Sequence, residues 1–154
     1  MIPVYQTIIS PVNGNCLAAC VASILEVSLD EVPQHIQDKN YFLDLSHYLE
    51  SKGYEFSGDA WKGHPVYDHL ILGREYDNDR LICEGVFPGV NGFFIVSGQS
   101  PRFENCHHAV VWNKWGLVHD PVPGGRGVEP NSVKMIYKPE EWPLKEKYKD
   151  IFKD

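Results

Sequence analysis

Apolar residues recur at helical spacing near the start of the chain. Within residues 16–27, the apolar positions 17, 20, 21, 24 and 25 trace one buried face of an α-helix. The turn-forming segment PVNGN precedes this helix, so Asn13 or Asn15 is the expected N-cap. Residues 28–32 (SLDEV) are expected to form a short capped turn that Pro33 stops.

A second helical period follows at residues 41–52. Phe42, Leu45 and Leu49 fall on one stripe, and Gly53 is the expected C-cap. Both segments are therefore predicted to be amphipathic helices.

The second half of the chain has the short apolar runs that are typical of β-strands. The expected strands are GFFIVSG (92–98), HAVVW (108–112), GLVHD (116–120) and SVKMIY (132–137). Residues 57–91 are expected to be loop with one strand at most, and the charged tail from Pro139 to end in a helix. Helices followed by strands predict an α+β fold, in which the helix that begins at Cys16 packs on an antiparallel sheet within a single domain spanning 1–154.

The composition is that of a folded protein with an acidic balance. Hydrophobic residues make up 43% of the chain and charged residues 23%. The 14 Lys and Arg against 21 Asp and Glu give a net charge of -7, which disfavours nucleic acid as a partner. Residues 1–10 do not resemble a secretory signal, and no stretch approaches the roughly 20 apolar residues of a membrane span. We therefore expect a cytoplasmic protein without a membrane partner, whose four cysteines stay reduced.

Cys16 stands where the first helix is expected to begin. Unpaired N–H groups and the helix dipole at this position favour a thiolate and lower the pKa of a cysteine. Cys20 lies one turn further on, within the apolar stripe, and is expected to be a core residue. Cys16 is thus the candidate nucleophile, and we expect it to react with iodoacetamide below the ordinary thiol pKa of about 8.5.

A hairpin at residues 106–121 provides the candidate base and its partner. A three-residue loop, Lys114-Trp115-Gly116, would pair Val110 with Asp120 and put His108 diagonal to Asp120 on the same face. A two-residue loop would instead put His107 on that face. A glycine at the third loop position favours the first register, and therefore His108.

Together these residues form the parts of an activated-thiol site. Cys16 would be the nucleophile, His108 the base and Asp120 the residue that orients the base. The backbone N–H of Cys16 and the side-chain amide of Gln6 are candidate donors to an oxyanion. The expected substrate is a peptide, protein or other amide, and no cofactor or metal is expected.

The chain order of these residues resembles papain-like thiol peptidases. It is most similar to the peptidase domains that trim double-glycine leaders from bacteriocin precursors, through Gln6, Asn15-Cys16, the run His-Ala-Val-Val and Asp120-Pro121. Small bacterial and phage proteins of uncharacterised activity have the same layout. The resemblance implies a papain-like cysteine proteinase fold, with Gln6, Cys16, His108 and Asp120 in the oxyanion, nucleophile, base and orienting roles. The ten-residue step from Gln6 to Cys16 is longer than in the leader peptidases, and no Gly-Pro follows the cysteine.

Three other functions remain open from the residues alone. Cys16 and Cys20 with His107 and His108 form a possible zinc set. A thiol acyltransferase of the transglutaminase type would use the same triad, and a binding module could keep the fold without catalysis.

Overall fold

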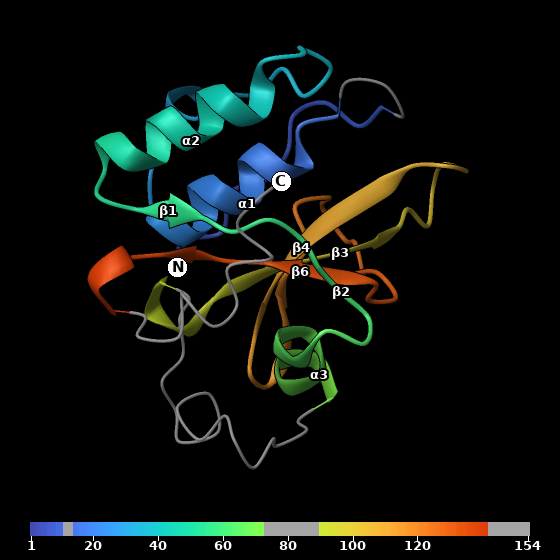
Figure 1. The fold of residues 1–154 in the computed structure, drawn as a ribbon. Coiled ribbons are helices and arrows are strands. Elements are labelled where there is room, and N and C mark those ends of the chain that lie inside the picture. The colour runs from blue at the N-terminus through green and yellow to red at the C-terminus, as the bar shows by residue number, and fades with distance from the viewer. Residues whose placement is uncertain (11–13, 73–89, 142–154) are drawn as a thin grey trace.

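An antiparallel sheet with helices on both faces forms the part of the chain that the computed structural model describes, residues 1–10, 14–72 and 90–141 (Figure 1). The elements in chain order are α1 (Cys16–Leu25), η1 (Leu29–Glu31), α2 (Tyr41–Ser51), β1 (Glu55–Phe56), β2 (Ala60–Trp61), α3 (Pro65–Leu72), η2 (Val90–Gly92), β3 (Phe94–Gln99), β4 (His107–Asn113), β5 (Gly116–His119), β6 (Ser132–Lys134), β7 (Ile136–Tyr137) and η3 (Pro139–Glu141).

The strands form two sheets. The larger one has the order β2-β6-β3-β4-β5, and β1 pairs with β7 in a second, two-stranded sheet. All of these pairings are antiparallel. The predicted α+β class, with the first helix against an antiparallel sheet, is confirmed.

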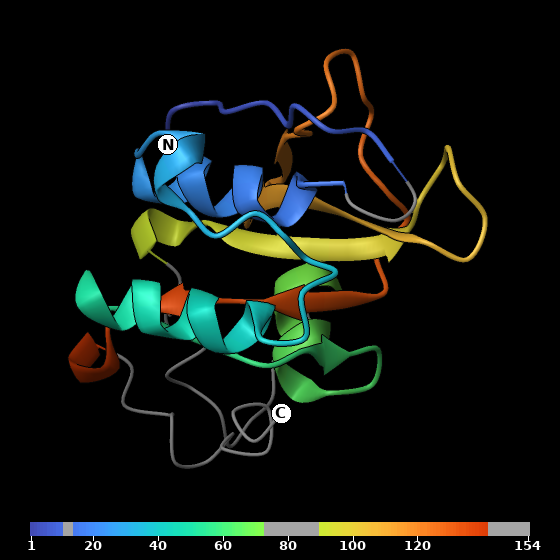
Figure 2. The same ribbon diagram turned by 90° about the horizontal axis from the view of Figure 1, so that it is seen from above.

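The large sheet is buried on both faces. Alternation along β3 turns Ile95 toward a core shared with α1 and α2, and Phe94 and Val96 toward a second core shared with α3. Figure 1 shows α1 and α2 on one side of the sheet and α3 on the other, and Figure 2 shows α1 and α2 lying side by side. Burial on both faces explains why the strands are nearly continuous apolar runs.

Helix α1 is enclosed almost completely. Its buried residues form one unbroken run from Leu17 to Ile24, so the expectation of a single buried face was too narrow. Asn15 is the N-cap residue, as one of the two alternatives predicted, but its side chain makes no capping hydrogen bond. The helix ends at Leu25, because Glu26 takes the left-handed conformation with φ 59°.

Helix α2 buries a different stripe from the one predicted. Tyr41, Leu45 and Leu49 are buried at a spacing of four residues, whereas Phe42 is 51% exposed. Phe42 was wrongly assigned to the core, because its position is turned about 100° from that of Tyr41 on a helix of 3.6 residues per turn. Gly53 follows the C-cap residue with φ 86°, which supports the predicted helix end.

Two other segments differ from the prediction. Residues 57–91 contain the helix α3 as well as β2, so the assignment of this segment to loop with one strand was wrong; its residues 73–89 lie outside the described ranges. The predicted strand 132–137 is divided into β6 and β7, because Met135 bonds to Ser57 through N–H···Oγ at 2.8 Å and β7 pairs with β1. The tail forms a 3₁₀ turn at Pro139–Glu141. The helix expected at the end of the tail lies outside the described residues.

The β4–β5 hairpin has the expected pairing near Asp120 but a different loop. Gly116 lies opposite Asn113, so the loop is Lys114-Trp115 and the predicted three-residue loop is wrong. A register shift then places Val111 opposite His119, which is the pairing that the three-residue loop would have produced. The shift therefore keeps His108 on the face of Asp120.

Candidate functional site

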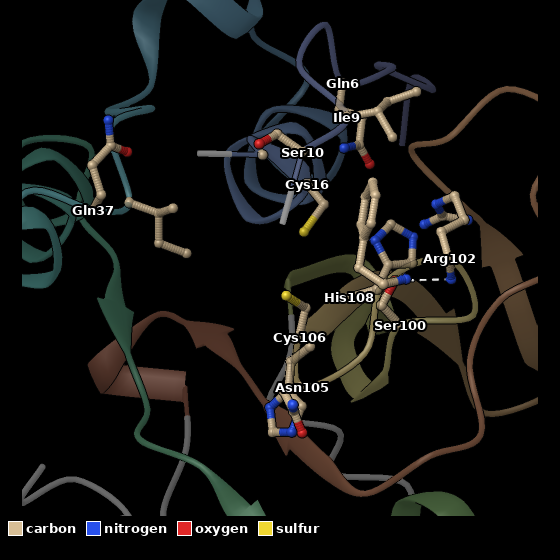
Figure 3. Close-up of a pocket in the computed structure, with 14 residues that line it drawn as sticks. Gln6, Ile9, Ser10, Cys16, Gln37, Ser100, Arg102, Asn105, Cys106 and His108 are labelled. Atoms are coloured by element: carbon tan, nitrogen blue, oxygen red, sulfur yellow. Dashed lines mark hydrogen bonds between the residues drawn. The ribbon is translucent and has the colours of Figure 1, made fainter. Parts of the chain in front are cut away.

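Cys16 is the first residue of α1, and its side chain lies in a hollow of about 360 Å³. Gln6, Arg102, Cys106 and His108 also line this hollow. Figure 3 shows the sulfur of Cys16 and the imidazole of His108 projecting into it from α1 and β4. The hollow is therefore lined from the start of α1 and from the start of β4, which are more than ninety positions apart in the sequence.

His108 is buried and bonded to Asp120. Its Nε2 lies 2.7 Å from Oδ1 of Asp120, and the two residues are 4% and 7% exposed. No hydrogen bond reaches Nδ1 of His108 from the residues that the structure describes. The expected pairing of His108 with Asp120 is confirmed, whereas His107 is exposed and its ring lies 6.4 Å from that of Trp61.

The loop after β5 surrounds the Asp120 carboxylate. Oδ1 also accepts the N–H of Val122 at 2.9 Å, and Oδ2 accepts the N–H of Gly127 at 2.9 Å. A Cβ on Gly125 would lie 2.4 Å from Oδ2, so only glycine fits there. The carboxylate is thereby fixed on three sides before any substrate arrives.

These contacts set the protonation state of the pair. Burial lowers the pKa of His108, and the hydrogen bond and charge of Asp120 offset this only in part. Burial would raise the pKa of Asp120, but the bonds from His108, Val122 and Gly127 outweigh it, so the net pKa is lowered. At neutral pH a neutral imidazole therefore donates Nε2–H to a carboxylate, and Nδ1 is left as a proton acceptor.

The Cys16 thiol does not have the lowered pKa that its helical position predicts. Burial raises this pKa, and hydrogen bonds from the backbone N–H groups of Ala109, Leu17 and Cys16 compensate only partly. The negative charge of Asp120 raises it further. The prediction of a lowered thiol pKa for Cys16 is thus wrong, because desolvation exceeds the effect of the helix N-terminus.

Gln6 lies at the edge of the same hollow, in the N-terminal segment. It is 8% exposed, its backbone N–H donates to Pro121 O at 3.0 Å, and its Nε2 donates to Ile8 O at 2.8 Å. Its Oε1 is buried and has no hydrogen-bond partner among the described residues. Ile8 O accepts one of the two Nε2 hydrogens, and the other has no acceptor within the part of the chain that the structure describes.

A second hollow, of about 330 Å³, adjoins the first and shares lining residues with it. Cys16 and His108 line both hollows. The second one is bounded by an ion pair between Asp59 and Lys134 and by the half-exposed ring of Trp61. Arg102 lines the first hollow and contributes to the lowered pKa of His108. Cys16 and His108 therefore lie where the two hollows adjoin.

The proposed zinc set is not brought together. Cys20 is fully buried in the apolar core, and His108 is bonded to Asp120. Across residues 1–10, 14–72 and 90–141, no three His, Cys, Asp or Glu side chains are grouped as a metal ion would need. Within the same ranges, no helix is long and apolar enough to span a bilayer.

Several contributors to the site had no distinct signal in the sequence. Ala109 and Leu17 act through backbone N–H groups, which every residue other than proline has. Gly125 and Gly127 belong to the run PGGRG, whose glycines are as typical of any surface turn as of a loop around a carboxylate. Only their position directly after Asp120 could have indicated this role.

Comparison of the chain with protein-family models, with curated proteins and with solved structures gave no match.

Proposed function

We propose that this protein is a cysteine hydrolase that acts on peptide, isopeptide or other amide bonds and belongs with the papain-like peptidases. The observation that carries the proposal is the 2.7 Å contact between His108 Nε2 and Asp120, which leaves Nδ1 as the basic atom of a ring that shares a hollow with Cys16. The chain order Gln6, Cys16, His108, Asp120 is the order of roles in that group.

The reaction begins from a neutral thiol and a neutral imidazole. His108 Nδ1 takes the thiol proton as the sulfur of Cys16 attacks the carbonyl carbon, and the carbonyl oxygen becomes an oxyanion. The N–H of Cys16 and the second Nε2 hydrogen of Gln6 donate to this oxygen. Asp120 stabilises the imidazolium that forms.

The intermediate then collapses in two stages. His108 gives its proton to the leaving amine, the C–N bond breaks, and an acyl thioester remains on Cys16. His108 next removes a proton from water, the hydroxide attacks the thioester, and the thiol is regenerated as the carboxylic acid leaves. The two hollows that Cys16 lines leave space for the acyl part and for the leaving part of a substrate.

Acylation by p-nitrophenyl acetate tests the proposal without a known substrate. The protein is expected to release p-nitrophenol in a stoichiometric burst, and peptide mapping by mass spectrometry is expected to find the acetyl group on Cys16. His108→Ala should slow this acylation by roughly 10²-fold or more, the usual contribution of a general base. Cys106→Ser is the control, because Cys106 lines the same hollow and takes no part in the steps proposed above.

Two results decide between the open functions. If Cys16 acetylates no faster than Cys106 and is indifferent to His108→Ala, the chain is a binding module and the hydrolase proposal is wrong. If added glycinamide captures most of the acetyl group in place of water, the chain is an acyltransferase.

A further inference from the structure

The side chain of Asn15 joins the N-terminal segment to the start of α1. Asn15 is 1% exposed. Its Oδ1 accepts the N–H groups of Thr7 and Ile8, both at 3.0 Å. Its Nδ2 donates to Thr7 Oγ1 at 3.0 Å and to Gln34 Oε1 at 3.1 Å. Every donor and acceptor position of this buried amide is therefore used.

The carbonyl of Ile8 connects this cluster to Gln6. It accepts the backbone N–H of Asn15 at 3.3 Å and the Nε2 of Gln6 at 2.8 Å. The Gln6 amide is thus held on an acceptor that is itself fixed to the residue directly before Cys16. Gly14 permits this approach, because a Cβ there would lie 2.8 Å from the backbone oxygen of Ser10.

The Asn15 side chain also forms no capping hydrogen bond with the first turn of α1. An N-cap side chain usually accepts an N–H from the first helical turn, but that of Asn15 makes no such bond and is turned to Thr7 and Ile8 instead. The N–H groups of Cys16 and Leu17 are directed at the Cys16 sulfur. The Asn15 side chain therefore leaves the N–H groups of the first helical turn unused and holds Thr7 and Ile8, the two residues that follow Gln6.

We propose that Asn15 is a positioning residue that holds the Gln6 amide beside the Cys16 N–H, so that the two form one oxyanion site. This inference rests on the proposed function. Without the Asn15 side chain, the N–H groups of Thr7 and Ile8 lose their acceptor, and only the backbone bond from Asn15 to the Ile8 carbonyl remains. The Gln6 amide is then held less firmly, while Cys16, His108 and Asp120 keep their places.

Two reactions of Cys16 separate this role from a structural one. Acylation by p-nitrophenyl acetate passes through an oxyanion, whereas alkylation by iodoacetamide does not. Asn15→Ala is expected to lower the acylation rate by about 10²-fold, the loss typical of one oxyanion donor, and to change alkylation by no more than about twofold. The ratio of the two rates is the readout, because it cancels any change in the reactivity of the thiol itself.

Ser23→Ala is the matched control. Ser23 is fully buried in α1, accepts the N–H of Val4 at 2.9 Å and donates to Ala19 O at 2.7 Å, so it anchors the same segment to the same helix. Its removal should cost comparable stability and leave the ratio of rates unchanged. Asn15→Asp keeps the acceptors for Thr7 and Ile8 and should retain most of the wild-type ratio, which also provides a test if Asn15→Ala does not fold.

Gln6→Ala completes the experiment. If Asn15 acts through Gln6, Asn15→Ala lowers the ratio no further in the Gln6→Ala background. Independent losses in the double variant, or equal losses of acylation and alkylation in Asn15→Ala, overturn the inference while the hydrolase proposal stands. Absence of acylation that depends on His108 in the wild-type protein overturns both.

Discussion

At the scale of single residues, the Asp120 carboxylate is the most constrained group of the site. Its two oxygens accept bonds from one side chain and two backbone N–H groups. A carboxylate can satisfy all three donors, because it is an acceptor at both oxygens. An amide of the same shape cannot, since its NH₂ group would face a backbone N–H in either orientation.

Asp120→Asn is therefore expected to reduce both stability and acylation. The unpaired N–H should lower the free energy of unfolding by about 1–3 kcal/mol, and loss of the charge should slow Cys16 acylation by at least about 10-fold. Urea denaturation and the p-nitrophenol burst measure the two effects. The control is Asp68→Asn, a buried carboxylate in α3 that accepts Gly63 N–H, which should affect stability alone.

The lowered pKa of His108 predicts the pH dependence of acylation. The rate should rise with pH through a midpoint below the ordinary histidine value of 6.5 and remain level through neutral pH, because only the neutral imidazole accepts the thiol proton. His108→Ala should leave only the reaction of free thiolate, which appears above the ordinary thiol pKa of about 8.5, because burial raises the pKa of Cys16. A wild-type midpoint above 6.5 contradicts this account.

At the scale of elements, the turn after β5 does more than connect strands. It folds back over Asp120 and provides the Gly127 N–H, whose residue has φ 87°. The Cβ position of Gly125 coincides with the carboxylate. The backbone of this loop, rather than its side chains, thus holds the acid.

Gly125→Ala is expected to push this loop away from Asp120. Loss of the Gly127 bond should slow Cys16 acylation by about 10-fold, because His108 is then less firmly oriented. Arg126→Ala removes a larger but exposed side chain from the same loop and should leave acylation unchanged. Equal effects of the two substitutions on the burst rate would show that the close approach of Gly125 to the carboxylate is unimportant.

At the scale of the whole molecule, the site joins two distant parts of the chain. Gln6 and Cys16 come from the first sixteen residues, whereas His108 lies in β4 of the large sheet and Asp120 directly after β5. The buried titratable side chains of His108 and Asp120 therefore lie close to the packing of α1 on the large sheet, on which the fold depends. Stability and the integrity of the site should respond together to acid.

The free energy of unfolding is expected to decrease in two steps as the pH is lowered. The folded pKa of His108 lies below 6.5 and that of Asp120 below 3.8, so in each case the unfolded chain binds its proton first. The stability linked to each group is present above its unfolded pKa and is lost as pH falls through its folded pKa. Urea midpoints measured across this range test the sign, and Asp120→Asn should flatten the profile below 3.8.

Much of the fold could be predicted because the local patterns are strong. The positions of α1, α2, β3, β4 and β5 follow from apolar spacing and turn residues, which act over a few neighbours. Phe42 and α3 could not be assigned in this way. Which side of α2 is buried depends on the face that meets the sheet, and α3 lies in a segment whose Gly and Asp residues favour loop.

The sequence by itself determined which side chains are available and their order: a cysteine where a helix begins, a histidine and an aspartate on the arms of one hairpin, and a glutamine ahead of them. The hairpin glycine also favoured His108 over His107, but through a three-residue loop; the structure reaches that pairing by a register shift that the hairpin residues do not indicate. Only the tertiary structure decided that the pKa of the Cys16 thiol is raised, because desolvation depends on everything packed around the sulfur, whereas the helix dipole depends only on local position.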